Sequence, residues 1–407
     1  MTRILLVCPE PLGHGRPAGI GIRFMEMSKV LIADQHALTV LSPDGGGVEG
    51  ASAQQLTPES LARETGNHDV AVVQGHAANA LFAHGKPLPT VIDLYDPFII
   101  ENLHYFASRG AEVFQHDHAT LMASIARGDL FLCASEAQRL FYLGVMIAAG
   151  RMNPITFEPD PHLDSLIRVA PFGVQPRRPD KFVPRTHDLL FGGIYDWYDP
   201  IVAIDAVAIA RETFPDITLT FNKHPNPDLT PQGKAAEAIE YVRKRGLGDF
   251  IRFVPWVAYE KRGEFFDQFA FSLLTFRQSI ETDLSMRTRV FDYLWGGLPL
   301  LTSSAPGTDD VLVRYGAGSV VPTESAATFA REIISLLRDE HLLATMRAGA
   351  ARFADDHQWS RVLEPLRAFC RSPRVDKQKD AFAVALQVPQ RPVSILDRLK
   401  RRIGGSF

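Results

Sequence analysis

The sequence predicts an α/β protein built from two doubly wound domains, each a parallel sheet covered by helices. Short apolar runs of strand length alternate with longer amphipathic segments along most of the chain, an order that is typical of parallel sheets. The chain has 407 residues, which is too long for one ordinary core and suits two domains of about 180 residues each. The first apolar run, 3–8, leads into a glycine- and proline-rich segment and then a helical pattern, the order in which a doubly wound domain begins.

The composition is that of an average globular protein. Hydrophobic residues make up 46% and charged residues 22% of the chain, and the formal net charge of −4 gives no indication of nucleic-acid binding. The three cysteines, Cys8, Cys133 and Cys370, lie far apart in apolar surroundings, so we expect reduced thiols in a cytoplasmic protein. No apolar run approaches the roughly 20 residues of a membrane span, and the first residues lack the layout of a signal peptide.

The first predicted domain covers residues 1–175. We expect its strands at 3–8, 36–44, 68–75, 88–98, the start of 128–144 and 167–174, and its helices at 22–34, 57–65, 98–108, 111–127 and the end of 128–144. Ser135 stands between the strand and the helix of the 128–144 segment, where it is either an N-cap or a ligand contact. Residues 176–187 are polar and rich in proline, which predicts an interdomain linker.

The second predicted domain covers residues 188–355 and repeats the alternation. We expect strands at the start of 187–200 and at 217–224, 249–257, 270–276, 300–302 and 316–322, and helices at 200–213, 231–245, 259–267, 309–315, 323–339 and 340–354. A further helix is expected at 356–372, and 373–407 is predicted to be a loose tail with a basic amphipathic end.

The most informative stretch is 281–303, for which we predict a loop, a helix, a turn and a strand. Thr282, Asp283 and Ser285 are good N-cap residues, so we expect the helix to begin among them. The glycine pair at 296–297 ends the helix, and the proline that follows prevents it from resuming. An apolar stripe at helical spacing consists of Met286, Val290 and Leu294.

A second face of this helix carries polar groups that suit a bound nucleotide. Thr288 and Asp292 are four residues apart and Arg289 and Asp292 are three apart, so their side chains lie together. A helix N-terminus preceded by small polar residues such as Ser285 binds anions through its free amides, and Arg287 and Arg289 add positive charge. We predict phosphate binding at the helix start and ribose binding at Asp292. The alternative is a salt bridge between Asp292 and Arg289 on a solvated face.

This stretch resembles the donor-binding helix of the GT-B glycosyltransferases, most closely those of glycosyltransferase family 4 (group 1). The family carries a carboxylate, then alanine or aromatic residues, then Gly-x-Pro and a strand. Asp292, five residues before Gly297, takes the place of the family's second glutamate. The first glutamate falls on Leu284, with Glu281 and Asp283 as the nearest carboxylates, so the two-glutamate motif is altered.

The resemblance covers about residues 1–370 and implies a fold, an activity and a set of substrates. It implies the GT-B fold, in which two Rossmann-like domains face a cleft and the helix at 356–372 crosses back to the first domain. It implies a retaining glycosyltransferase that moves a sugar from a nucleotide-sugar donor to a glycan or lipid-linked acceptor in cell-surface polysaccharide assembly. The nucleoside-diphosphate sugar is then a substrate, and we expect neither a cofactor nor a metal, because no metal-ligand spacing is present in the sequence.

Acceptor-side candidates follow the first and fourth strands of the first domain. Gly19 and Gly21 stand where the family's first glycine loop approaches its substrates, although they also suit a plain tight turn. His14, in the same loop, is either a ligand contact or a loop histidine. Asp93 and Asp96 lie at the end of the fourth strand, where ligands of open α/β sheets collect. We predict that one of them orients an acceptor hydroxyl as a catalytic residue; the alternative is a cap on the next helix.

Donor-side candidates outside the 281–303 stretch are Gly193 and Lys223. The family has a basic residue after the first glycine turn of the second domain, which Gly193 marks in this chain, but 192–197 contains no basic residue. Lys223, at the end of the next strand, is therefore a candidate phosphate contact, and a surface lysine is the other interpretation. Tyr195 or Trp197 is suited to stack on a base, and the alternative for Trp197 is to anchor the domain interface.

Residues 392–407 differ from the rest of the chain. They combine an apolar face, Ile395, Leu396, Leu399 and Ile403, with the basic cluster Arg398, Lys400, Arg401 and Arg402. Such a segment predicts an interfacial helix at an anionic membrane surface, worth roughly 1 kcal/mol per basic residue, and hence a peripheral protein at the inner face of the membrane. A solvated tail or a protein-docking helix is the alternative.

Two other functions stay open at this point. Leu284 and the missing phosphate cation favour a GT-B binding protein with a decayed site that scaffolds a glycan assembly complex. A sugar-nucleotide epimerase of the same fold is the third hypothesis. Turnover of nucleotide sugars with and without an acceptor separates the three.

Overall fold

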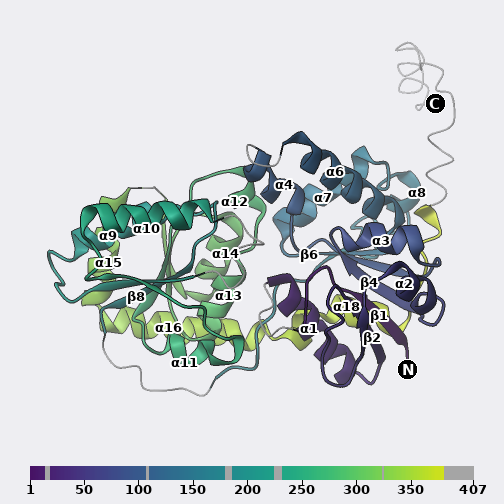
Figure 1. Cartoon of the computed structure of the whole chain (residues 1–407), viewed down its shortest axis with the longest axis horizontal. Helices are drawn as coiled ribbons and strands as arrows, with labels where there is room; N and C mark the ends of the chain where they lie inside the picture. The colour runs from purple at the N-terminus through teal and green to yellow at the C-terminus, as the bar shows by residue number, and fades with distance from the viewer. Residues whose placement is uncertain (14–18, 107–109, 179–185, 224–231, 323–324, 380–407) are drawn as a thin grey trace, which may run out of the picture.

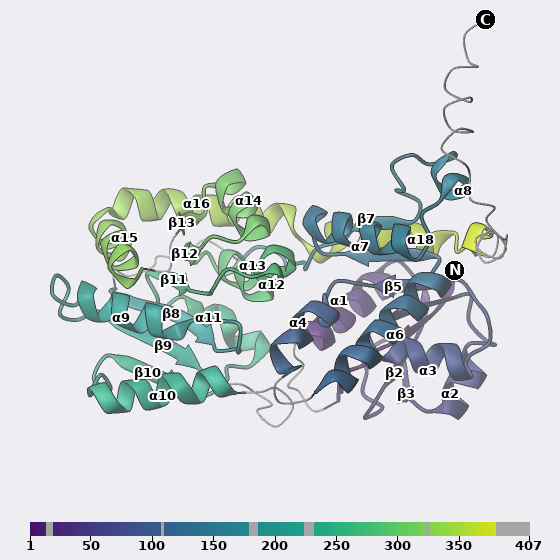
Figure 2. The same cartoon turned by 90° about the horizontal axis from the view of Figure 1, so that it is seen from above.

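The computed structural model describes residues 1–13, 19–106, 110–178, 186–223, 232–322 and 325–379. The chain forms two parallel β-sheets that lie side by side, each covered by helices (Figure 1). Figure 2 shows the same two halves from above, with the last helices passing from the second half to the first. The predicted fold class, two doubly wound α/β domains, is confirmed.

The first sheet has seven strands in the order β3-β2-β1-β4-β5-β6-β7. The strands are β1 (Arg3–Val7), β2 (Ala37–Ser42), β3 (Ser52–Gln55), β4 (Val70–Gln74), β5 (Thr90–Asp93), β6 (Leu130–Cys133) and β7 (Ile167–Val169). All neighbouring strands are parallel. Every residue of β4, β5 and β6 is buried, which explains why these strands appear in the sequence as apolar runs.

The second sheet has six strands in the order β10-β9-β8-β11-β12-β13. The strands are β8 (Asp188–Gly193), β9 (Thr218–Asn222), β10 (Ile251–Val254), β11 (Phe271–Leu274), β12 (Leu300–Ser303) and β13 (Gly318–Val321). They are also parallel throughout. The strand order reverses beside β1 in the first sheet and beside β8 in the second, and such switch points are where doubly wound sheets bind ligands.

The helices of the first domain begin after the glycine loop. They are α1 (Gly19–Ala33), α2 (Pro58–Glu64), α3 (Ala77–His84), α4 (Phe98–Glu101), the 3₁₀-helix η1 (Asn102–Tyr105), α6 (Ala111–Arg127), α7 (Glu136–Ala148) and α8 (Pro154–Phe157). Ser135 is the N-cap of α7, because its side chain accepts a hydrogen bond from the Gln138 amide at 3.2 Å. The N-cap interpretation of this serine is therefore confirmed.

The second domain has its own helices, and the last helices of the chain return to the first domain. The helices of the second domain are α9 (Pro200–Ala210), α10 (Gly233–Arg245), the 3₁₀-helix η2 (Tyr259–Lys261), α11 (Arg262–Phe266), α12 (Ile280–Leu284), α13 (Thr288–Trp295), α14 (Pro306–Tyr315), α15 (Ala326–Arg338) and α16 (Glu340–Asp356), and those that follow are α17 (Trp359–Val362) and α18 (Glu364–Arg371). The chain crosses at residue 357, whose carbonyl accepts a hydrogen bond from the Val174 amide at 2.8 Å. Arg367 then pairs with Asp34 at 2.6 Å.

One strand, β3, is absent from the sequence-based expectation. Three of its four residues are polar, and three of the four are exposed. The strand pairs through its backbone with residues 39–42 of β2. Because backbone hydrogen bonds place it at the edge of the sheet, no apolar pattern marks it in the sequence.

The start of the predicted tail is not loose. The Asp376 amide donates to the Asp129 carboxylate at 2.7 Å, and the Lys379 ammonium pairs with the same carboxylate at 2.8 Å. Arg151 forms an ion pair with Asp376 as well. The expectation of a loose segment from 373 onward is therefore wrong for residues 376–379, since a buried carboxylate of the first domain holds them. The basic segment 392–407 lies outside the described residues.

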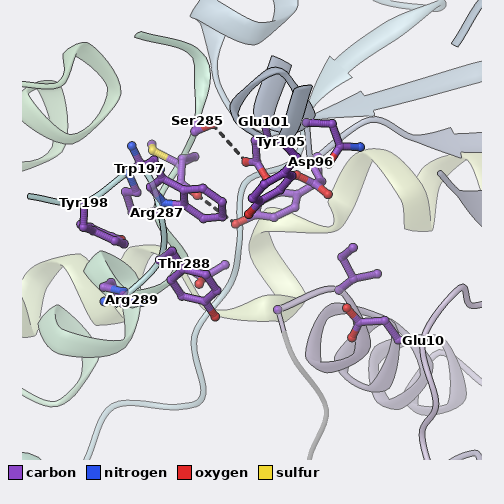
Figure 3. Close-up of a pocket in the computed structure, with 16 residues that line it drawn as sticks. Glu10, Asp96, Glu101, Tyr105, Trp197, Tyr198, Ser285, Arg287, Thr288 and Arg289 are labelled. Atoms are coloured by element: carbon purple, nitrogen blue, oxygen red, sulfur yellow. Dashed lines mark hydrogen bonds between the residues drawn. The ribbon is translucent and has the colours of Figure 1, made fainter. Parts of the chain in front are cut away.

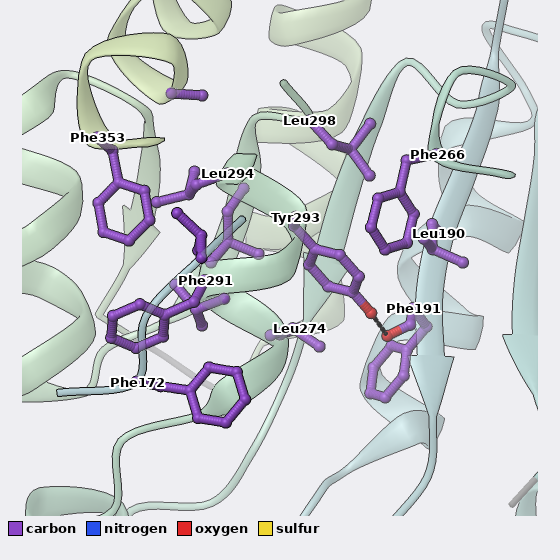
Figure 4. Close-up of a cluster of buried hydrophobic side chains, with 14 of the residues drawn as sticks. Phe172, Leu190, Phe191, Phe266, Leu274, Phe291, Tyr293, Leu294, Leu298 and Phe353 are labelled. Carbon is purple, nitrogen blue, oxygen red and sulfur yellow. Dashed lines mark hydrogen bonds between the residues drawn. The ribbon is translucent and has the colours of Figure 1, made fainter. Parts of the chain in front are cut away.

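The apolar face of α13 fixes this helix in the second domain (Figure 4). Val290, Phe291, Tyr293 and Leu294 are all buried. The Phe291 ring packs on Phe353 of α16 with 5.4 Å between centroids, and the Tyr293 hydroxyl donates to the Phe191 carbonyl at 2.8 Å. Truncating such a side chain typically costs 3–5 kcal/mol of stability, so the position of α13 is set by the core.

The helix does not begin among Thr282, Asp283 and Ser285 as expected. Residues 280–284 form the separate short helix α12, and Ser285 and Arg287 have extended backbones before α13 begins at Thr288. The end is as predicted: α13 stops at Trp295 and Gly297 follows with φ +75°. The strand that follows, predicted at 300–302, is β12.

The sequence also predicts reduced thiols and no apolar run long enough to span a membrane. Cys8, Cys133 and Cys370 are buried and form no disulfide. Burial raises the pKa of Cys133 to about 12, so this thiol is unreactive at neutral pH. No described helix combines the length and the apolar character needed to cross a bilayer.

Candidate functional site

A cavity of about 300 Å³ lies between the two domains. Its carboxylates come from the first domain and its arginines from the second (Figure 3). The carboxylates are Glu10, Asp96 and Glu101, and the arginines are Arg287 and Arg289. The two walls therefore differ in the sign of their charged groups.

The second-domain wall is the N-terminal end of α13. Arg287 is its N-cap residue and makes no side-chain cap hydrogen bond, and the first amides of a helix have no intrahelical acceptors. Ser285, Thr288 and Arg289 line the cavity beside it. The amides and the helix dipole favour a negative group at this place. The four residues, all predicted from the sequence, are brought together on one wall of the cavity.

Arg287 is held rigidly by a buried carboxylate. Its guanidinium pairs with both oxygens of Glu281, with Nη2 at 2.7 Å from Oε2, and the two residues are 5% and 1% exposed. Burial lowers the pKa of Arg287, but Glu281, Tyr198 and Glu101 together outweigh it and leave the pKa raised. The guanidinium also lies 5.3 Å from the ring centre of Tyr198. One formal charge of this arginine is thus already compensated.

Arg289 has a different environment. Its Nη1 donates to the Gly193 carbonyl, and its guanidinium lies over Tyr198 at 4.5 Å and Tyr195 at 5.2 Å. Within the described residues no carboxylate lies close enough to form an ion pair with it. The predicted alternative of a bridge between Arg289 and Asp292 is wrong, and Arg289 is the cation of this wall whose charge is available to a ligand.

Asp292 pairs instead with Arg262 of α11, whose Nε lies 3.0 Å from its carboxylate. Burial raises the pKa of Asp292, although Arg262 acts in the opposite direction. Arg262 is itself stacked between Tyr259 at 3.6 Å and Trp295 at 4.1 Å. Asp292 still faces a second cavity, of about 120 Å³, that adjoins the first through Thr288 and Arg289.

The second cavity also contains Gly193 and Lys223 in its wall. A Cβ atom at Gly193 would lie 3.4 Å from the Arg289 guanidinium, so the absence of a side chain lets this arginine approach the strand end. Lys223 is exposed, and its backbone amide donates to the Val254 carbonyl at 2.9 Å. Tyr195 and Trp256 supply aromatic surface to the same wall, which suits a flat base.

The start of α1 meets the start of α13 directly. Gly19 opens α1 and lines both cavities. A Cβ atom at Gly19 would lie 3.4 Å from Cγ2 of Thr288, which is van der Waals contact, so the two domains approach closely here. The Gly21 amide donates to the Glu10 carboxylate at 2.8 Å, which turns that carboxylate toward the cavity. His14 lies outside the described residues, and its role stays a prediction.

Asp93 does not reach the cavity. It is 1% exposed and forms a bidentate ion pair with Arg23, with Nε at 2.7 Å and Nη2 at 3.0 Å from its oxygens. Arg23 also donates to the carbonyls of residues 170 and 171, so the pair ties α1 and β5 to the end of β7. We correct the catalytic prediction for Asp93: both of its oxygens are engaged in a structural ion pair. It is not a helix cap either, because Pro97 is the N-cap of α4.

Asp96 lines the cavity, as predicted, and it has a neighbour that the sequence did not indicate. Glu101 lines the same wall of the cavity. Burial raises the pKa of both carboxyl groups. The negative charge of Glu281 raises both pKa values further, and that of Asp93 raises the pKa of Asp96 further. Glu101 ends α4 and also accepts a hydrogen bond from the Ser285 hydroxyl at 3.1 Å.

The first domain holds the three residues that precede α13. The side-chain amide of Gln138 donates to the Leu284 carbonyl at 3.0 Å, and the Tyr95 hydroxyl donates to the Met286 carbonyl at 3.1 Å. With the bond from Ser285 to Glu101, residues 284–286 are bound at every position. Leu284, which stands where the family has its first glutamate, is 7% exposed and contributes its backbone to the interface. No sequence signal marks these three contacts, because their partners lie 146, 191 and 184 residues apart in the chain.

Comparisons with known proteins show which fold this is. No family model matches the chain. A D-inositol 3-phosphate glycosyltransferase of Jonesia denitrificans is 26% identical over 47% of this chain, and the match spans 44% of that relative's length. The chain therefore matches less than half of this curated relative.

Solved structures match nearly the whole chain. HepE of Anabaena, in complex with UDP and glucose, has a TM-score of 0.65 at 15% identity and covers 92% of this chain and 100% of its own. Sucrose-phosphate synthase from Thermosynechococcus elongatus has a TM-score of 0.65 at 13% identity, with 94% and 100% covered. WaaG, a glycosyltransferase involved in lipopolysaccharide biosynthesis, has a TM-score of 0.62 at 15% identity, with 90% and 98% covered. The chain has the GT-B fold of these glycosyltransferases, as the resemblance implied.

Proposed function

We propose that the protein is a glycosyltransferase that moves a sugar from a nucleoside-diphosphate sugar to an acceptor bound by the first domain. The observation that carries this proposal is the cavity between the domains, where the N-terminus of α13 and Arg289 face the carboxylates Asp96 and Glu101. The anionic donor fits the first wall and the acceptor lies against the second. The curated relative and the fold neighbours are glycosyltransferases by name, which supports the activity.

In this proposal the diphosphate lies at the start of α13. As the bond between the anomeric carbon and the phosphate oxygen breaks, its electron pair stays with the leaving nucleoside diphosphate, where negative charge builds. Fixed donors that face this charge lower the barrier, and removing one typically costs on the order of 10²–10³ in rate. Arg289 supplies a full charge, Arg287 a guanidinium that Glu281 keeps in place, and Thr288 a hydroxyl, whereas the Ser285 hydroxyl already donates to Glu101.

The nucleoside is proposed to lie in the second cavity. Tyr195 and Trp256 offer aromatic surface for the base, and Asp292 offers a carboxylate to the ribose hydroxyls. Lys223, at the mouth of the same cavity, adds a cation on the diphosphate side. HepE is described in complex with UDP and glucose, which supports a nucleoside diphosphate and a sugar as the two parts of the donor.

Several finer features rest on the sequence alone, either on the family resemblance or on residue patterns. These are retention of the anomeric configuration, transfer without a metal or cofactor, a glycan or lipid-linked acceptor in cell-surface polysaccharide assembly, a cytoplasmic location, and membrane contact through 392–407. Within the described residues, no three potential ligands among His, Cys, Asp and Glu are grouped as a metal site. We propose these features together, and the acceptor and the membrane contact each need an experiment of their own.

A binding protein with a decayed site is the second candidate function. Leu284 in place of the family glutamate and the absence of a cation in 192–197 favour it. The epimerase hypothesis predicts conversion of the nucleotide sugar with no acceptor present. Arg289, free of a carboxylate partner in the described structure and placed at the helix start, favours turnover over decay.

A thermal-shift screen with UDP, GDP and ADP tests the donor site first. A ligand that binds only the folded protein raises the free energy of unfolding by mass action, by about 2.7 kcal/mol at 100 times its dissociation constant. The melting temperature rises as a result. We expect one nucleoside diphosphate to stabilise the protein strongly and its nucleoside to do so weakly. Release of that diphosphate from its glucose or mannose conjugate then measures turnover. Binding without turnover in any acceptor extract supports the scaffold, and no binding of any diphosphate refutes both.

A further inference from the structure

The chain between α12 and α13 leaves the helical conformation without a residue that ends a helix. Residues 280–295 contain no glycine and no proline. The backbone nevertheless stops being helical after Leu284 and resumes at Thr288, with ψ 132° at Ser285 and ψ 109° at Arg287. Because local sequence preference does not explain this break, contacts from other parts of the molecule must hold it.

The first domain holds the break through two backbone carbonyls. The side-chain amide of Gln138 donates to the Leu284 carbonyl at 3.0 Å. The Tyr95 hydroxyl donates to the Met286 carbonyl at 3.1 Å. In a continuous helix each of these carbonyls would accept from the amide four positions further along the chain. The first domain therefore occupies two acceptors that a continuous helix needs.

The side chain of Gln138 is fixed in the orientation that this contact requires. It is completely buried, and its Oε1 accepts from the Ala134 amide at 2.7 Å. Its Nε2 donates to the Tyr95 carbonyl at 3.0 Å as well as to the Leu284 carbonyl, so both N–H groups and the oxygen are engaged. Gln138 does not line the cavity, and it acts on a ligand only through the backbone of residue 284.

The ion pair within the second domain acts on the same break. Glu281 and Arg287 are six residues apart, and side chains at that spacing do not lie on the same face of a continuous helix. Their bidentate contact, with Nη2 at 2.7 Å from Oε2, is compatible only with an interrupted helix. The pair opposes a continuous helix from the second domain, and the donors of the first domain act together with it.

The break determines which amides are free at the start of α13. The Val290 amide donates to the Arg287 carbonyl at 3.0 Å. Within the part of the chain that the structure describes, the amides of Thr288 and Arg289 have no acceptor, and both residues line the cavity. Helix geometry would bring the Thr288 amide to the Leu284 carbonyl if that carbonyl lost its donor.

We propose that Gln138 and Tyr95 are positioning residues of the donor site. By holding the carbonyls of residues 284 and 286 outside the helix, they keep the amides of Thr288 and Arg289 available to an anionic ligand. The anion site at the start of α13 is complete only while the first domain supplies these two donors. The inference rests on the proposed function for the identity of the anion, a nucleoside diphosphate, and it adds the residues that assemble its site.

Hydrogen exchange of the free protein, resolved by residue, tests this role without a ligand. Gln138→Leu keeps a side chain of similar size without N–H groups. It should slow exchange at Thr288 and Arg289 by about 5-fold or more, the effect of one ordinary hydrogen bond. Tyr95→Phe removes only the hydroxyl and should act in the same direction, and it decides the question if Gln138→Leu does not fold. Asn153→Ala, which removes the N-cap of α8, is the matched control and should leave these amides unchanged. Unchanged or faster exchange in the folded test variant overturns the proposal.

Calorimetry with UDP, GDP and ADP measures the consequence for the site. Gln138→Leu should weaken binding of the diphosphate that the wild type prefers by about 10-fold or more, through the loss of a hydrogen bond to a charged group. Proline does not fit inside a helix, and Ser285 already has the extended backbone that precedes proline. In a Met286→Pro background the loss caused by Gln138→Leu should therefore shrink.

The outcomes separate the positioning role from the donor site itself. Full affinity in Gln138→Leu, or an equal loss with and without Met286→Pro, overturns the positioning role even when the diphosphate binds. Absence of any diphosphate binding by the wild type removes the proposed donor site instead. Hydrogen exchange of the free protein still decides in that case whether the break depends on Gln138.

Discussion

Arg289 and Arg287 stand two residues apart at the start of the donor helix, and the structure predicts opposite outcomes when each is changed to alanine. Arg289 forms one hydrogen bond to the Gly193 carbonyl and stacks on two tyrosines. Arg287 completes a buried ion pair with Glu281. We therefore expect Arg289→Ala to lose ligand affinity with a nearly normal fold, and Arg287→Ala to lose stability first.

The magnitudes follow from these contacts. A hydrogen bond to a charged group is worth about 1.5–3 kcal/mol, so Arg289→Ala should weaken diphosphate binding by about 10- to 150-fold. Its loss of stability should stay at or below about 1.5–3 kcal/mol, the value of the one hydrogen bond that its guanidinium donates to Gly193. Arg287→Ala leaves the Glu281 carboxylate buried without its cation, which costs about 3–5 kcal/mol.

Titration calorimetry with the nucleoside diphosphate and its nucleoside, beside urea unfolding of each variant, measures both effects. Arg289→Ala should affect the diphosphate far more than the nucleoside, because only the former carries the charge that Arg289 faces. Arg289→Lys is the matched control: it keeps the charge, loses the planar fork and should fall between alanine and wild type. Equal losses for the diphosphate and the nucleoside would refute the phosphate role, as would unfolding of Arg289→Ala at the same urea concentration as Arg287→Ala.

Three further changes test other parts of the site. Glu281→Gln should destabilise the protein by about 3–5 kcal/mol in urea unfolding, because it leaves Arg287 buried without a carboxylate. Asp283→Asn, on the exposed side of the same helix, should change the stability by no more than about 0.5 kcal/mol. Similar losses for both variants would contradict a special role of the Glu281–Arg287 pair. Asp292→Asn should reduce the preference for a ribonucleotide over its 2′-deoxy form by about 2- to 12-fold, measured by calorimetry, and an unchanged preference would leave Asp292 only its contact with α11. Deleting 392–407 should abolish flotation with anionic vesicles at low salt and leave diphosphate binding intact, since basic residues attract such surfaces and salt screens them; equal flotation of both forms rules out the membrane role of that segment.

The strands of both sheets were predictable because they are buried on both faces. Nothing but an apolar run satisfies such a position, and the predicted runs at 68–75, 88–98 and 270–276 contain β4, β5 and β11. The edge strand β3 failed the same test, since backbone pairing with β2 is enough to hold polar residues there. Sequence patterns report burial, and they miss an element that is held by its backbone.

The helix start was predicted less well, for a reason that lies outside the helix. Good N-cap residues stand at 282, 283 and 285, yet α13 begins at Thr288. The extended backbone before it is bound by the first domain at Leu284, Ser285 and Met286. Contacts between distant segments therefore outweigh local capping preference, and a single sequence does not reveal them.

The two strand-end aspartates show the same limit on prediction of the site. Asp93 and Asp96 are three residues apart and equally suited to a cleft by the rule for open sheets. Arg23, 70 residues earlier, takes both oxygens of Asp93, whereas Asp96 lines the cavity. Which carboxylate stays available is decided by its partner rather than by its place on the strand.

The contacts at residues 284–286 connect the two halves of the proposed reaction. This segment belongs to the donor domain in sequence, but its hydrogen bonds go to Tyr95, Gln138 and Glu101 of the acceptor domain. Arg287 and then α13 follow this segment, and Glu101 lines the opposite wall of the cavity. A ligand that moves Glu101 therefore acts through Ser285 on the start of the helix that faces the diphosphate. Because hydrogen bonds rather than a flexible linker carry this connection, acceptor and donor binding are expected to be coupled in free energy, and the coupling must be equal in both directions.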